Sequence, residues 1–373
     1  MKIMITSFQW PSYKKGGVSL IAFKHANMLI NSGHEVSICG TSLNIETENI
    51  KAVNKIFINA SGSGSLYSPY KVDRIKLRDE IERVMPDIMI VEAWHTAIGD
   101  FTIRIAHDLS IPIMMVSHGI SFSPFSYTFK EILRSVLWQY NKYFIFPNLF
   151  KKIDVLACLS LTSSSKRFYD LDLARYHNKN IKKISNSPVN FIENNNTFKD
   201  RSDSVVIIGY FSRVKAQLRA IKIAKELAQS GVVFKFIGKK EGAYYEKCKA
   251  ASTTSNIFFL SDDEVSIASE ISKSKLILSI SIVEALPINL IEVIASGNPF
   301  VATDVGAVSE LKGGVTAKYD HLLFKEHILK ILKNQDYWMK LSAEGRKDYI
   351  SNYSDSIVNN QLLSAIESIK RSS

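Results

Sequence analysis

The sequence lacks several features that would assign it to a simple class of protein. Its 373 residues include three cysteines, Cys39, Cys158 and Cys248, and none of them belongs to a CxxC pair. Neither a disulfide framework nor a zinc site is therefore indicated, and a reducing cytoplasm fits best. The sequence has no run of 18 apolar residues, and the opening stretch MKIMITSFQWP lacks the pattern of a cleavable signal. We therefore expect a protein that is soluble or lies on a membrane surface.

Two further absences bear on the ligand. The Gly16–Gly17 pair is not part of a GxGxxG motif, which argues against a nicotinamide dehydrogenase. No recognised nucleic-acid-binding module is found, and a net charge of +11 over 373 residues is modest for that class. The charge is nevertheless uneven, because residues 1–190 carry 23 Lys and Arg against 15 Asp and Glu, a net +8. Charge alone predicts an anionic partner for the first half: nucleic acid, anionic lipid or a phosphorylated substrate.

What the sequence does contain is an alternation of short apolar runs and helix-period segments along its whole length. This alternation is typical of repeated βα units that feed a parallel sheet, and the chain is too long for one ordinary core. We therefore predict an α/β protein with two doubly wound domains. The predicted strands lie near residues 3–8, 35–39, 55–59, 87–92, 111–117 and 154–160, and then near 205–210, 232–237, 257–260, 276–280 and 300–302.

The polar stretch NSPVNFIENNNTFKDRSDS, residues 186–204, has neither hydrophobic period and predicts the linker between the domains. We assign residues 1–185 to the first domain and 186–350 to the second. Residues 351–373 are predicted to contain a closing amphipathic helix that packs back toward the first domain. Because open α/β sheets bind ligands at the carboxyl ends of their strands, functional residues are expected in the loops that follow strands, at a cleft between the domains.

The stretch EALPINLIEVIASGNPFVATDVGAVSE, residues 284–310, is mostly apolar yet carries acids at fixed places. Glu284 follows a predicted strand and precedes Pro287, where a helix is expected to begin because proline costs little in the first turn. Glu292 then lies in the first turns of that helix. Both acids can point at one ligand across the helix N-terminus, whose free N–H groups favour phosphate. On these residues alone, two solvated acids stabilised by the helix dipole are an equally good interpretation.

This stretch resembles the signature of the retaining, family-four glycosyltransferases of the GT-B fold. It has a Glu, seven residues, a second Glu, a small-residue helix end, Gly-x-Pro, a strand, and a Gly before a further Glu. The resemblance extends to ISNSPVNF, IIGYFSRVKAQLRAIKIAKEL, VVFKFIGKKE and IFFLSDDEVSIASEISKSKLILSIS, and so covers nearly all of residues 181–320. It implies two Rossmann-like domains that face a cleft, the first on the acceptor side and the second binding a nucleotide-sugar.

The resemblance also implies roles for individual residues of the second domain. Glu284 is expected to contact hydroxyls of the transferred sugar, and Glu292 to hold the ribose hydroxyls of the nucleotide. A carboxylate suits both tasks because it accepts two charge-assisted hydrogen bonds from a diol. Arg213 and Lys215 are expected beside the diphosphate, with Lys215 the better aligned because the family's spacing between the two is longer. Solvated cations beside a helix start are the alternative for this pair.

In the first domain, Gly16 and Gly17 match the loop that lets the backbone approach the nucleotide's phosphate, although a Gly-Gly pair is usually only a turn. His118, after the strand IPIMMVS, matches a histidine beside the transferred sugar, or is a structural residue that bonds locally. The acidic SDDE, residues 261–264, superficially offers a metal site. We interpret it instead as the N-cap of the following helix, with Ser261 or Asp262 as the capping residue, and expect no metal or other cofactor.

The function implied is transfer of a sugar from a UDP- or GDP-sugar to a lipid-linked saccharide, with retention of configuration and no side-chain general base. The expected pathway is bacterial O-antigen, capsule or exopolysaccharide synthesis, at the cytoplasmic face of the inner membrane and without nucleic acid. Pro287 supports this, because the proline form of the motif occurs in polymer-building members. The alternative is a non-catalytic member of the same fold that binds a sugar nucleotide or a partner enzyme.

One segment predicts contact with a membrane. TFKEILRSVLWQYNKYFIFPNLFKK, residues 128–152, holds five Lys and Arg against one Glu, with seven aromatic residues among them. Interfacial helices combine basic and aromatic residues in this way. The alternative is a helix packed on the first sheet, since Ile132, Val136 and Tyr140 form a stripe at helical spacing.

Overall fold

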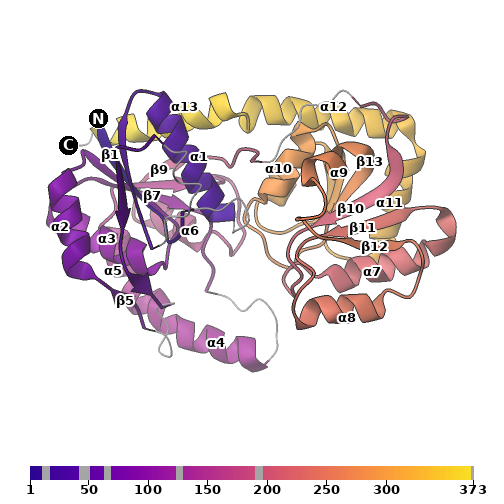
Figure 1. Cartoon of the computed structure of the whole chain (residues 1–373), viewed down its shortest axis with the longest axis horizontal. Coiled ribbons are helices and arrows are strands. Elements are labelled where there is room, and N and C mark those ends of the chain that lie inside the picture. Colours follow the sequence, from indigo (N-terminus) through magenta and orange to yellow (C-terminus); the bar gives the residue numbers. More distant parts are fainter. Residues whose placement is uncertain (11–16, 42–50, 63–68, 123–128, 190–195, 371–373) are drawn as a thin grey trace. The chain divides into compact units, whose positions relative to one another are not determined.

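The computed structural model describes residues 1–10, 17–41, 51–62, 69–122, 129–189 and 196–370. The chain divides into two compact units. Unit 1 comprises Met1–Ser185 together with Val358–Ser373, and unit 2 comprises Asn186–Ile357. Each unit is built on its own parallel sheet (Figure 1).

The sheet of unit 1 has seven parallel strands in the order β3-β2-β1-β6-β7-β8-β9. Its inner strands are largely apolar because helices cover both faces of the sheet. The bounds of the seven strands are β1 Lys2–Thr6, β2 Glu35–Gly40, β3 Asn54–Phe57, β6 Ile88–Glu92, β7 Ile113–Ser117, β8 Val155–Cys158 and β9 Asn180–Lys183. A separate antiparallel pair consists of β4 Ala60–Ser61 and β5 Lys71–Val72.

Helices lie on both faces of this sheet, with α1 and α13 on one face and α3 and α5 on the other (Figure 1). Their bounds are α1 Gly17–Asn31, α2 Arg74–Val84, α3 Ala97–Asp108, α4 Phe129–Tyr140, the π-helix η2 Asn141–Ile145, α5 Phe146–Lys151, α6 Tyr169–Tyr176 and α13 Asp355–Lys370.

The last helix, α13, belongs to the core of unit 1. Val358, Leu362, Ala365 and Ile366 are buried in one cluster with residues of α1 and of the sheet. The predicted helix was expected to begin at residue 351. It begins four residues later because the preceding α12, Gln335–Asn352, extends through that position.

The sheet of unit 2 has six parallel strands in the order β12-β11-β10-β13-β14-β15. Their bounds are β10 Ser202–Ile208, β11 Val233–Ile237, β12 Ile257–Leu260, β13 Ser274–Ser279, β14 Phe300–Thr303 and β15 Gly314–Ala317. The helices are α7 Gln217–Glu226, α8 Ala243–Ala251, α9 Ile267–Lys273, α10 Ile288–Ala295, α11 His321–Lys333 and α12, with short 3₁₀ turns η3 Ala228–Ser230 and η4 Val308–Glu310.

The predicted fold class, α/β with two doubly wound parallel sheets, is confirmed. The prediction missed β9 and β15, because NIKK and GVTA contain no apolar run and all eight residues are only half-buried. Among the described residues, no helix combines the length and apolar character that crossing a bilayer requires.

The strand orders identify one place in each sheet where ligands are expected. In unit 1 the first strand, β1, lies between β2 and the later strand β6, and in unit 2 the first strand, β10, lies between β11 and β13. The chain therefore leaves the first strand toward one side of the sheet and returns on the other. The loops that follow the two strands at such a switch point diverge and leave a crevice between them.

Candidate functional site

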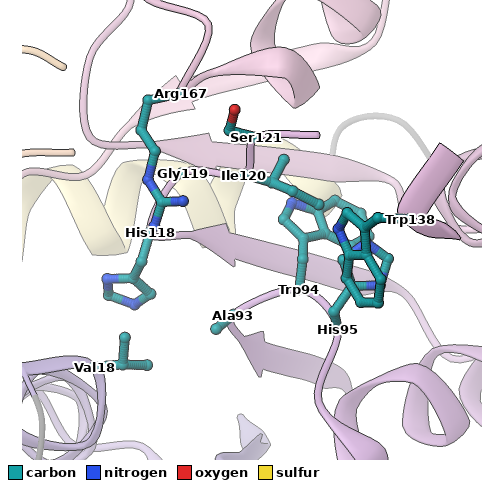
Figure 2. A pocket seen from close by; sticks show the side chains of 10 residues that line it. All are labelled: Val18, Ala93, Trp94, His95, His118, Gly119, Ile120, Ser121, Trp138 and Arg167. Carbon is teal, nitrogen blue, oxygen red and sulfur yellow. The ribbon is translucent and has the colours of Figure 1, made fainter. Parts of the chain in front are cut away.

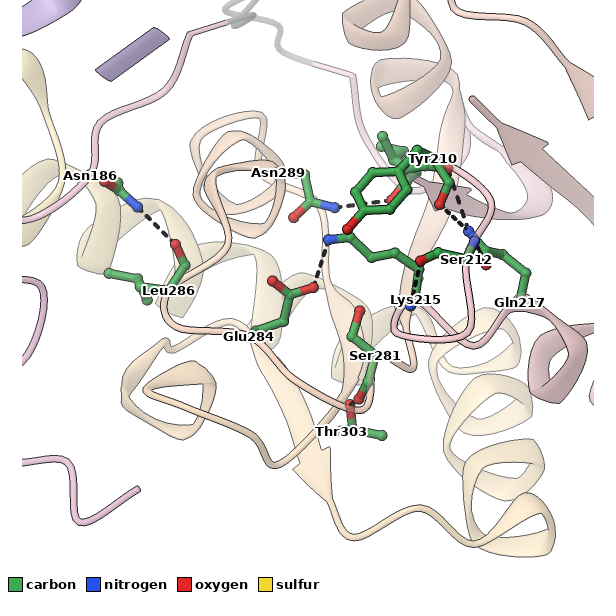
Figure 3. Close-up of polar contacts among 12 residues, drawn as sticks. Asn186, Tyr210, Ser212, Lys215, Gln217, Ser281, Glu284, Leu286, Asn289 and Thr303 are labelled. Atoms are coloured by element: carbon green, nitrogen blue, oxygen red, sulfur yellow. Dashed lines mark hydrogen bonds and ion pairs between the residues drawn. The ribbon is translucent and has the colours of Figure 1, made fainter. Parts of the chain in front are cut away.

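In unit 2 the two loops at the switch point bring a cation and an acid together. The loop after β10 carries Lys215 and the loop after β13 carries Glu284. The Lys215 Nζ atom lies 2.6 Å from Glu284 Oε1, in the contact drawn in Figure 3. The side chains are 19% and 14% exposed, so the pair is shielded from bulk water yet reachable by a ligand. The structure thus joins two residues that the sequence separates by 69 positions.

Side chain to backbone bonds shape the loop that carries Lys215. Gln217 Nε2 donates to the carbonyl of Tyr210 over 3.0 Å, and Gln217 Oε1 accepts from the N–H of Ser212. The Lys215 N–H donates to Ser212 Oγ. Gly209 has φ 141°, a backbone conformation that other residues rarely adopt, and the Lys215 methylenes pack beside it. Gln217 was not predicted, although a polar residue at the start of a helix is the kind that satisfies loop N–H and C=O groups.

A turn after β14 supports the loop that carries Glu284. Gly306 has φ 63°, and a Cβ atom there would collide with the carbonyl oxygens of Glu284 and Ala285. The next N–H, of Ala307, donates to the carbonyl of Ala285 over 2.7 Å. Only glycine adopts this backbone while allowing so close an approach. The Gly of the sequence signature therefore has a packing role at this site.

Glu292 lies on α10, which begins directly after Pro287, the helix start that the sequence predicted. The residue is 4% exposed, and its Oε1 accepts the N–H of Val189 over 3.1 Å. Asn186 Nδ2 donates to the carbonyl of Leu286 over 2.8 Å. Both bonds tie the first residues of unit 2 to the segment that holds the two glutamates. Glu292 therefore has a structural partner, whatever ligand it binds.

A buried arginine fixes the other end of α10. Arg201 donates to the carbonyl of Ser296, just after the helix, and to the side chain of Asn298. Desolvation lowers the pKa of Arg201 to about 10, and the guanidinium remains charged at neutral pH. A cation beside the carbonyls at a helix C-terminus is favourable. Sequence reasoning missed Arg201, because a lone arginine in a polar linker carries no periodic signal.

Arg213 is exposed and forms no ion pair with any described residue. Gly16 lies outside the described residues, and Gly17 is the first residue of α1. Within the described ranges, no cluster of His, Cys, Asp or Glu could hold a metal ion.

The predicted cap in SDDE was wrong. The N-cap of α9 is Ser266, whose side chain accepts from the N–H of Ser269. Residues 261–264 instead form a turn of their own, in which the Glu264 carboxylate accepts from the N–H of Ser261. Glu264 also forms an ion pair with Lys240, so this carboxylate already has two partners within unit 2. The helix starts later because residues 262–264 form a turn, and Ser266, which follows that turn, has the extended backbone that an N-cap requires.

In unit 1, His118 is one of three buried polar residues joined in a line. The Glu92 carboxylate, at the end of β6, accepts from His25 Nδ1 at 2.7 Å through one oxygen and contacts His118 Nε2 at 2.9 Å through the other. The side chains of Glu92 and His25 are almost fully buried and that of His118 is 11% exposed. Sequence reasoning found His118 but not its partners, which lie 26 and 93 positions earlier in the chain.

Glu92 is ionised between its two histidines. Burial by itself raises the pKa of the carboxyl, but the charge of His25 and the hydrogen bonds from both rings outweigh burial and lower the pKa to about 2. A buried carboxylate is stable only when paired and hydrogen-bonded in this way. Glu92 therefore fixes the His118 ring through Nε2, and the other edge of that ring is available to the adjacent pocket.

That pocket has a volume of about 310 Å³ and opens beside His118 (Figure 2). Two residues of the loop after β6, Ala93 at φ 73° and His95 at φ 55°, have left-handed backbones. Strained backbones of this kind persist where the surroundings over-determine them, often at functional sites. The lining residues are Val18, Ala93, Trp94, His95, His118, Gly119, Ile120, Ser121, Trp138 and Arg167.

Comparison with known proteins agrees with this arrangement. Residues 189–348 match the family model described as glycosyl transferases group 1. No curated protein matches the chain in sequence. A solved glycosyltransferase from Rickettsia africae ESF-5 is similar in structure, with 16% identity, coverage of 100% of this chain and 99% of that one, and a TM-score of 0.74.

Two more solved structures are similar over nearly the whole chain. HepE of Anabaena, in complex with UDP-glucose, has 15% identity, coverage of 99% and 100%, and a TM-score of 0.71. WaaG, described as a glycosyltransferase involved in lipopolysaccharide biosynthesis, has 14% identity, coverage of 96% and 98%, and a TM-score of 0.69. At these identities the likeness shows the fold, and the chain therefore has the GT-B fold.

We expect the Glu92 carboxylate to stabilise unit 1 in a pH-dependent way. Because its folded pKa of about 2 lies below the ordinary 4.5, this stabilisation is complete above pH 4.5 and is lost as the pH falls toward 2. Replacing Glu92 with Gln should therefore cost on the order of 3 kcal/mol at pH 7 and progressively less below pH 4.5. Urea unfolding of both proteins at several pH values measures the difference.

The matched control is Glu35→Gln, since Glu35 is an exposed acid on β2 of the same unit. It should leave stability unchanged at every pH. A Glu92→Gln protein whose deficit is the same at pH 3 as at pH 7 would contradict an ionised, histidine-paired carboxylate.

Proposed function

We propose that this protein is a glycosyltransferase that moves a sugar from a nucleotide-sugar to a lipid-linked saccharide, with retention of configuration at the anomeric carbon. It acts in the synthesis of a bacterial cell-surface polysaccharide, such as O-antigen, capsule or exopolysaccharide, at the cytoplasmic face of the inner membrane. The observation that carries the proposal is the Lys215–Glu284 pair at the switch point of unit 2. This pair lies inside the stretch that matches glycosyl transferases group 1.

The pair suits the reacting end of a nucleotide-sugar. Lys215 has three N–H donors, and Glu284 engages one of them, so two remain for oxygens of a diphosphate. As the glycosidic bond breaks, negative charge grows on that diphosphate, and a cation in a shielded site stabilises it. Glu284 then accepts hydroxyls of the donor sugar while its contact with Lys215 keeps the carboxylate oriented. Glu292, eight positions further on, holds the ribose hydroxyls.

Retention requires the acceptor to attack from the face that the diphosphate leaves. The bond from the anomeric carbon to the phosphate oxygen breaks, and its electron pair stays on the diphosphate. The acceptor oxygen bonds to the same carbon and passes its proton to the leaving phosphate. No side chain need act as the general base in this scheme. His118, fixed by Glu92, lies beside the transferred sugar as a hydrogen-bonding partner.

Among donors we favour a UDP-sugar over a GDP-sugar. The support is that HepE, which has the same fold, was solved with UDP-glucose bound. For the pathway, the support is that WaaG, also of this fold, is involved in lipopolysaccharide biosynthesis. We take no nucleic acid to be a partner, because the excess positive charge of the first half is accounted for by a membrane surface and a phosphorylated donor.

The membrane contact is proposed for α4 and η2 of unit 1. Six apolar and aromatic side chains of this segment are between 42% and 63% exposed. Monomeric proteins rarely expose so many large apolar groups in one stretch unless something covers them. We call this set the α4 ridge: Ile132, Leu133, Val136, Tyr140, Tyr143 and Phe144.

The opposite side of the same segment packs into unit 1. Ser135 Oγ donates to the carbonyl of Phe122, and Gln139 Nε2 donates to the same carbonyl. The helical stripe of Ile132, Val136 and Tyr140 is exposed, so the alternative interpretation of this segment, a helix packed on the sheet through that stripe, was wrong. A lipid surface is the cover we propose, because the Lys142 ammonium lies 5.0 Å from the ring of Tyr143, a residue of the ridge, and can attract anionic headgroups.

A non-catalytic protein of the same fold, which binds a sugar nucleotide or a partner enzyme, is the competing function. The intact Lys215–Glu284 pair favours an enzyme, since a pure binding protein has no need to stabilise a leaving group. Hydrolysis of a UDP-sugar by the purified protein would show that it is an enzyme and exclude the non-catalytic alternative.

We expect substitution of Glu284 to lower turnover and substitution of Glu292 to weaken nucleotide binding. Glu284→Gln should lower turnover roughly 30-fold with little change in UDP affinity, since it removes a charge-assisted contact worth about 2 kcal/mol to the reacting sugar. Glu292→Gln should weaken UDP binding by a similar factor. Its amide oxygen can still accept the Val189 N–H, so the melting temperature should stay close to that of the unchanged protein.

These variants are compared by calorimetric titration with UDP and by UDP-sugar hydrolysis. Glu246→Gln is the matched control, because Glu246 is an exposed acid on α8 of the same unit. Wild-type kinetics and affinity in both site variants would refute the assignment of the site.

We also expect activity to be independent of divalent metal, because Lys215 and helix N-termini are proposed to stabilise the diphosphate. Hydrolysis and transfer should change less than about twofold after treatment with excess EDTA. A complete loss of activity, reversed by adding Mg²⁺ or Mn²⁺, would contradict this expectation. It would show that the acidic turn at residues 261–264 has to be reconsidered as a metal site.

Membrane binding by the α4 ridge predicts a specific defect in sedimentation with vesicles. A protein with Val136, Tyr140, Tyr143 and Phe144 all changed to Ser should partition at least about tenfold less onto anionic vesicles, since losing about 1.4 kcal/mol of apolar burial is a tenfold effect. Binding of the unchanged protein should also be weaker on neutral vesicles.

The control variant changes four other exposed apolar residues of unit 1 to Ser: Phe57, Ile75, Met85 and Tyr176. It removes a comparable amount of exposed apolar surface and should pellet like the unchanged protein. Equal pelleting of the ridge variant and the control variant would rule out the α4 ridge as the membrane contact.

A further inference from the structure

The pocket in unit 1 extends from His118 to a group of aromatic residues that the transfer of the donor sugar does not use. We propose that this pocket binds the terminal sugar of the acceptor and selects a sugar that carries an anionic group, a carboxylate or a phosphate. That the bound sugar belongs to an acceptor rests on the proposed function. That the bound sugar is anionic follows from the residues that line the pocket.

The volume limits the ligand to one sugar ring. Sites for drug-sized ligands range from about 300 to 1,000 Å³, and this pocket, at about 310 Å³, is at the lower limit. A single hexose with one substituent fits such a space, whereas an oligosaccharide would have to extend beyond it. The terminal residue of a growing saccharide is therefore the part that we place there.

One end of the pocket offers flat apolar faces to a sugar ring. Trp94 and Trp138 line it, and their indole side chains are held in place by their surroundings (Figure 2). Trp94 Nε1 donates to Asp170 Oδ2 over 2.8 Å. Trp138 packs edge-on against the His95 ring, with centroids 5.1 Å apart. Rigid aromatic rings give a large contact area at little cost in entropy, which suits the C–H face of a pyranose.

The other end is polar and positively charged. Arg167 and His118 line it, and in Figure 2 the Arg167 side chain extends toward the His118 ring. Arg167 is half-buried, so its charge is partly shielded from water. None of the described residues that line the pocket is Asp or Glu. The Glu92 charge lies behind His118 and is bonded to two histidines.

This charge pattern favours an anionic sugar over a neutral one. Planar guanidinium groups bind carboxylate and phosphate through paired, charge-assisted hydrogen bonds. A lining with an arginine and without a carboxylate offers a neutral sugar fewer acceptors for its hydroxyl protons. We therefore assign Arg167 to the anionic substituent and Trp138 to the ring.

The position of Trp138 links this pocket to the membrane. Trp138 lies on α4, whose other side carries the α4 ridge. A sugar in the pocket and a lipid layer on the α4 ridge would thus contact the same helix from two sides. An acceptor whose saccharide is attached to a lipid can satisfy both contacts at once, which a free oligosaccharide cannot.

The test measures binding of three small glycosides to the full chain by saturation-transfer NMR and by quenching of tryptophan fluorescence. The probes are methyl β-glucuronide, glucose 6-phosphate and, as the neutral match, methyl β-glucoside. We expect one of the two anionic probes to bind at least tenfold more tightly than the glucoside, and which one it is distinguishes a carboxylate from a phosphate.

Two variants assign the contacts. Arg167→Gln should abolish the preference for the anionic probe, whereas Arg104→Gln, which changes an exposed arginine on α3 of the same unit, should keep it. Trp138→Leu should weaken binding of all three probes about tenfold. The melting temperature and the UDP affinity of each variant are measured as well, so that a folding defect is not taken for a lost contact.

The inference is overturned if charged and neutral probes bind equally, if Arg167→Gln keeps the preference, or if none of the three binds to protein that binds UDP. Failure of the proposed function is separate from these outcomes. If the protein binds the anionic glycoside but neither binds nor hydrolyses any UDP-sugar, the pocket assignment is supported and the proposed glycosyltransferase function is refuted.

Discussion

The candidate site depends on one topological constraint, the pairing of each unit's first strand with a strand from much later in the chain. In unit 2, β10 pairs in parallel with β13, with Val205 opposite Leu276 and Val206 opposite Ile277. Parallel neighbours end at the same edge of the sheet, so the loops that follow them meet there. The 2.6 Å contact between Lys215 and Glu284 is a direct consequence. In unit 1, the pairing of β1 with β6 brings Glu92 close to the helix that follows β1, and His25 lies on that helix.

Buried polar groups then hold these loops in position. Arg201, Gln217 and Glu92 each satisfy backbone or side-chain partners that would otherwise be buried without hydrogen bonds. Each is costly to desolvate and is stable only because its partners are in place. The donors and acceptors of such a site are in position before any ligand arrives, and groups placed in advance are what stabilise charge that develops during a reaction. Gly306 adds a steric constraint, because no larger residue fits against the Glu284 loop.

Helix α4 contributes two different surfaces to unit 1. One side places Trp138 at the pocket and bonds to the Phe122 carbonyl, and the other side exposes the α4 ridge. The π-helix η2 follows directly and continues into α5, whose Phe146 and Phe150 are buried. π-Helical turns frequently occur at functional sites, where they alter the direction in which side chains point. The aromatic residues of this segment are therefore divided between core, pocket and surface, and their composition alone does not reveal that division.

The sequence by itself determined the α/β class, most strands of both main sheets, the helix start at Pro287 and the positions of Lys215, Glu284 and His118 after their strands, because hydrophobic period and local motifs encode these features within a few residues. Only the tertiary structure decided which loops meet. It joined His118 to Glu92 and His25, placed Arg201 at the end of α10, moved the cap from Ser261 to Ser266, and turned the stripe of α4 outward. Contacts between residues tens of positions apart depend on strand order and side-chain packing, and a single sequence does not display either.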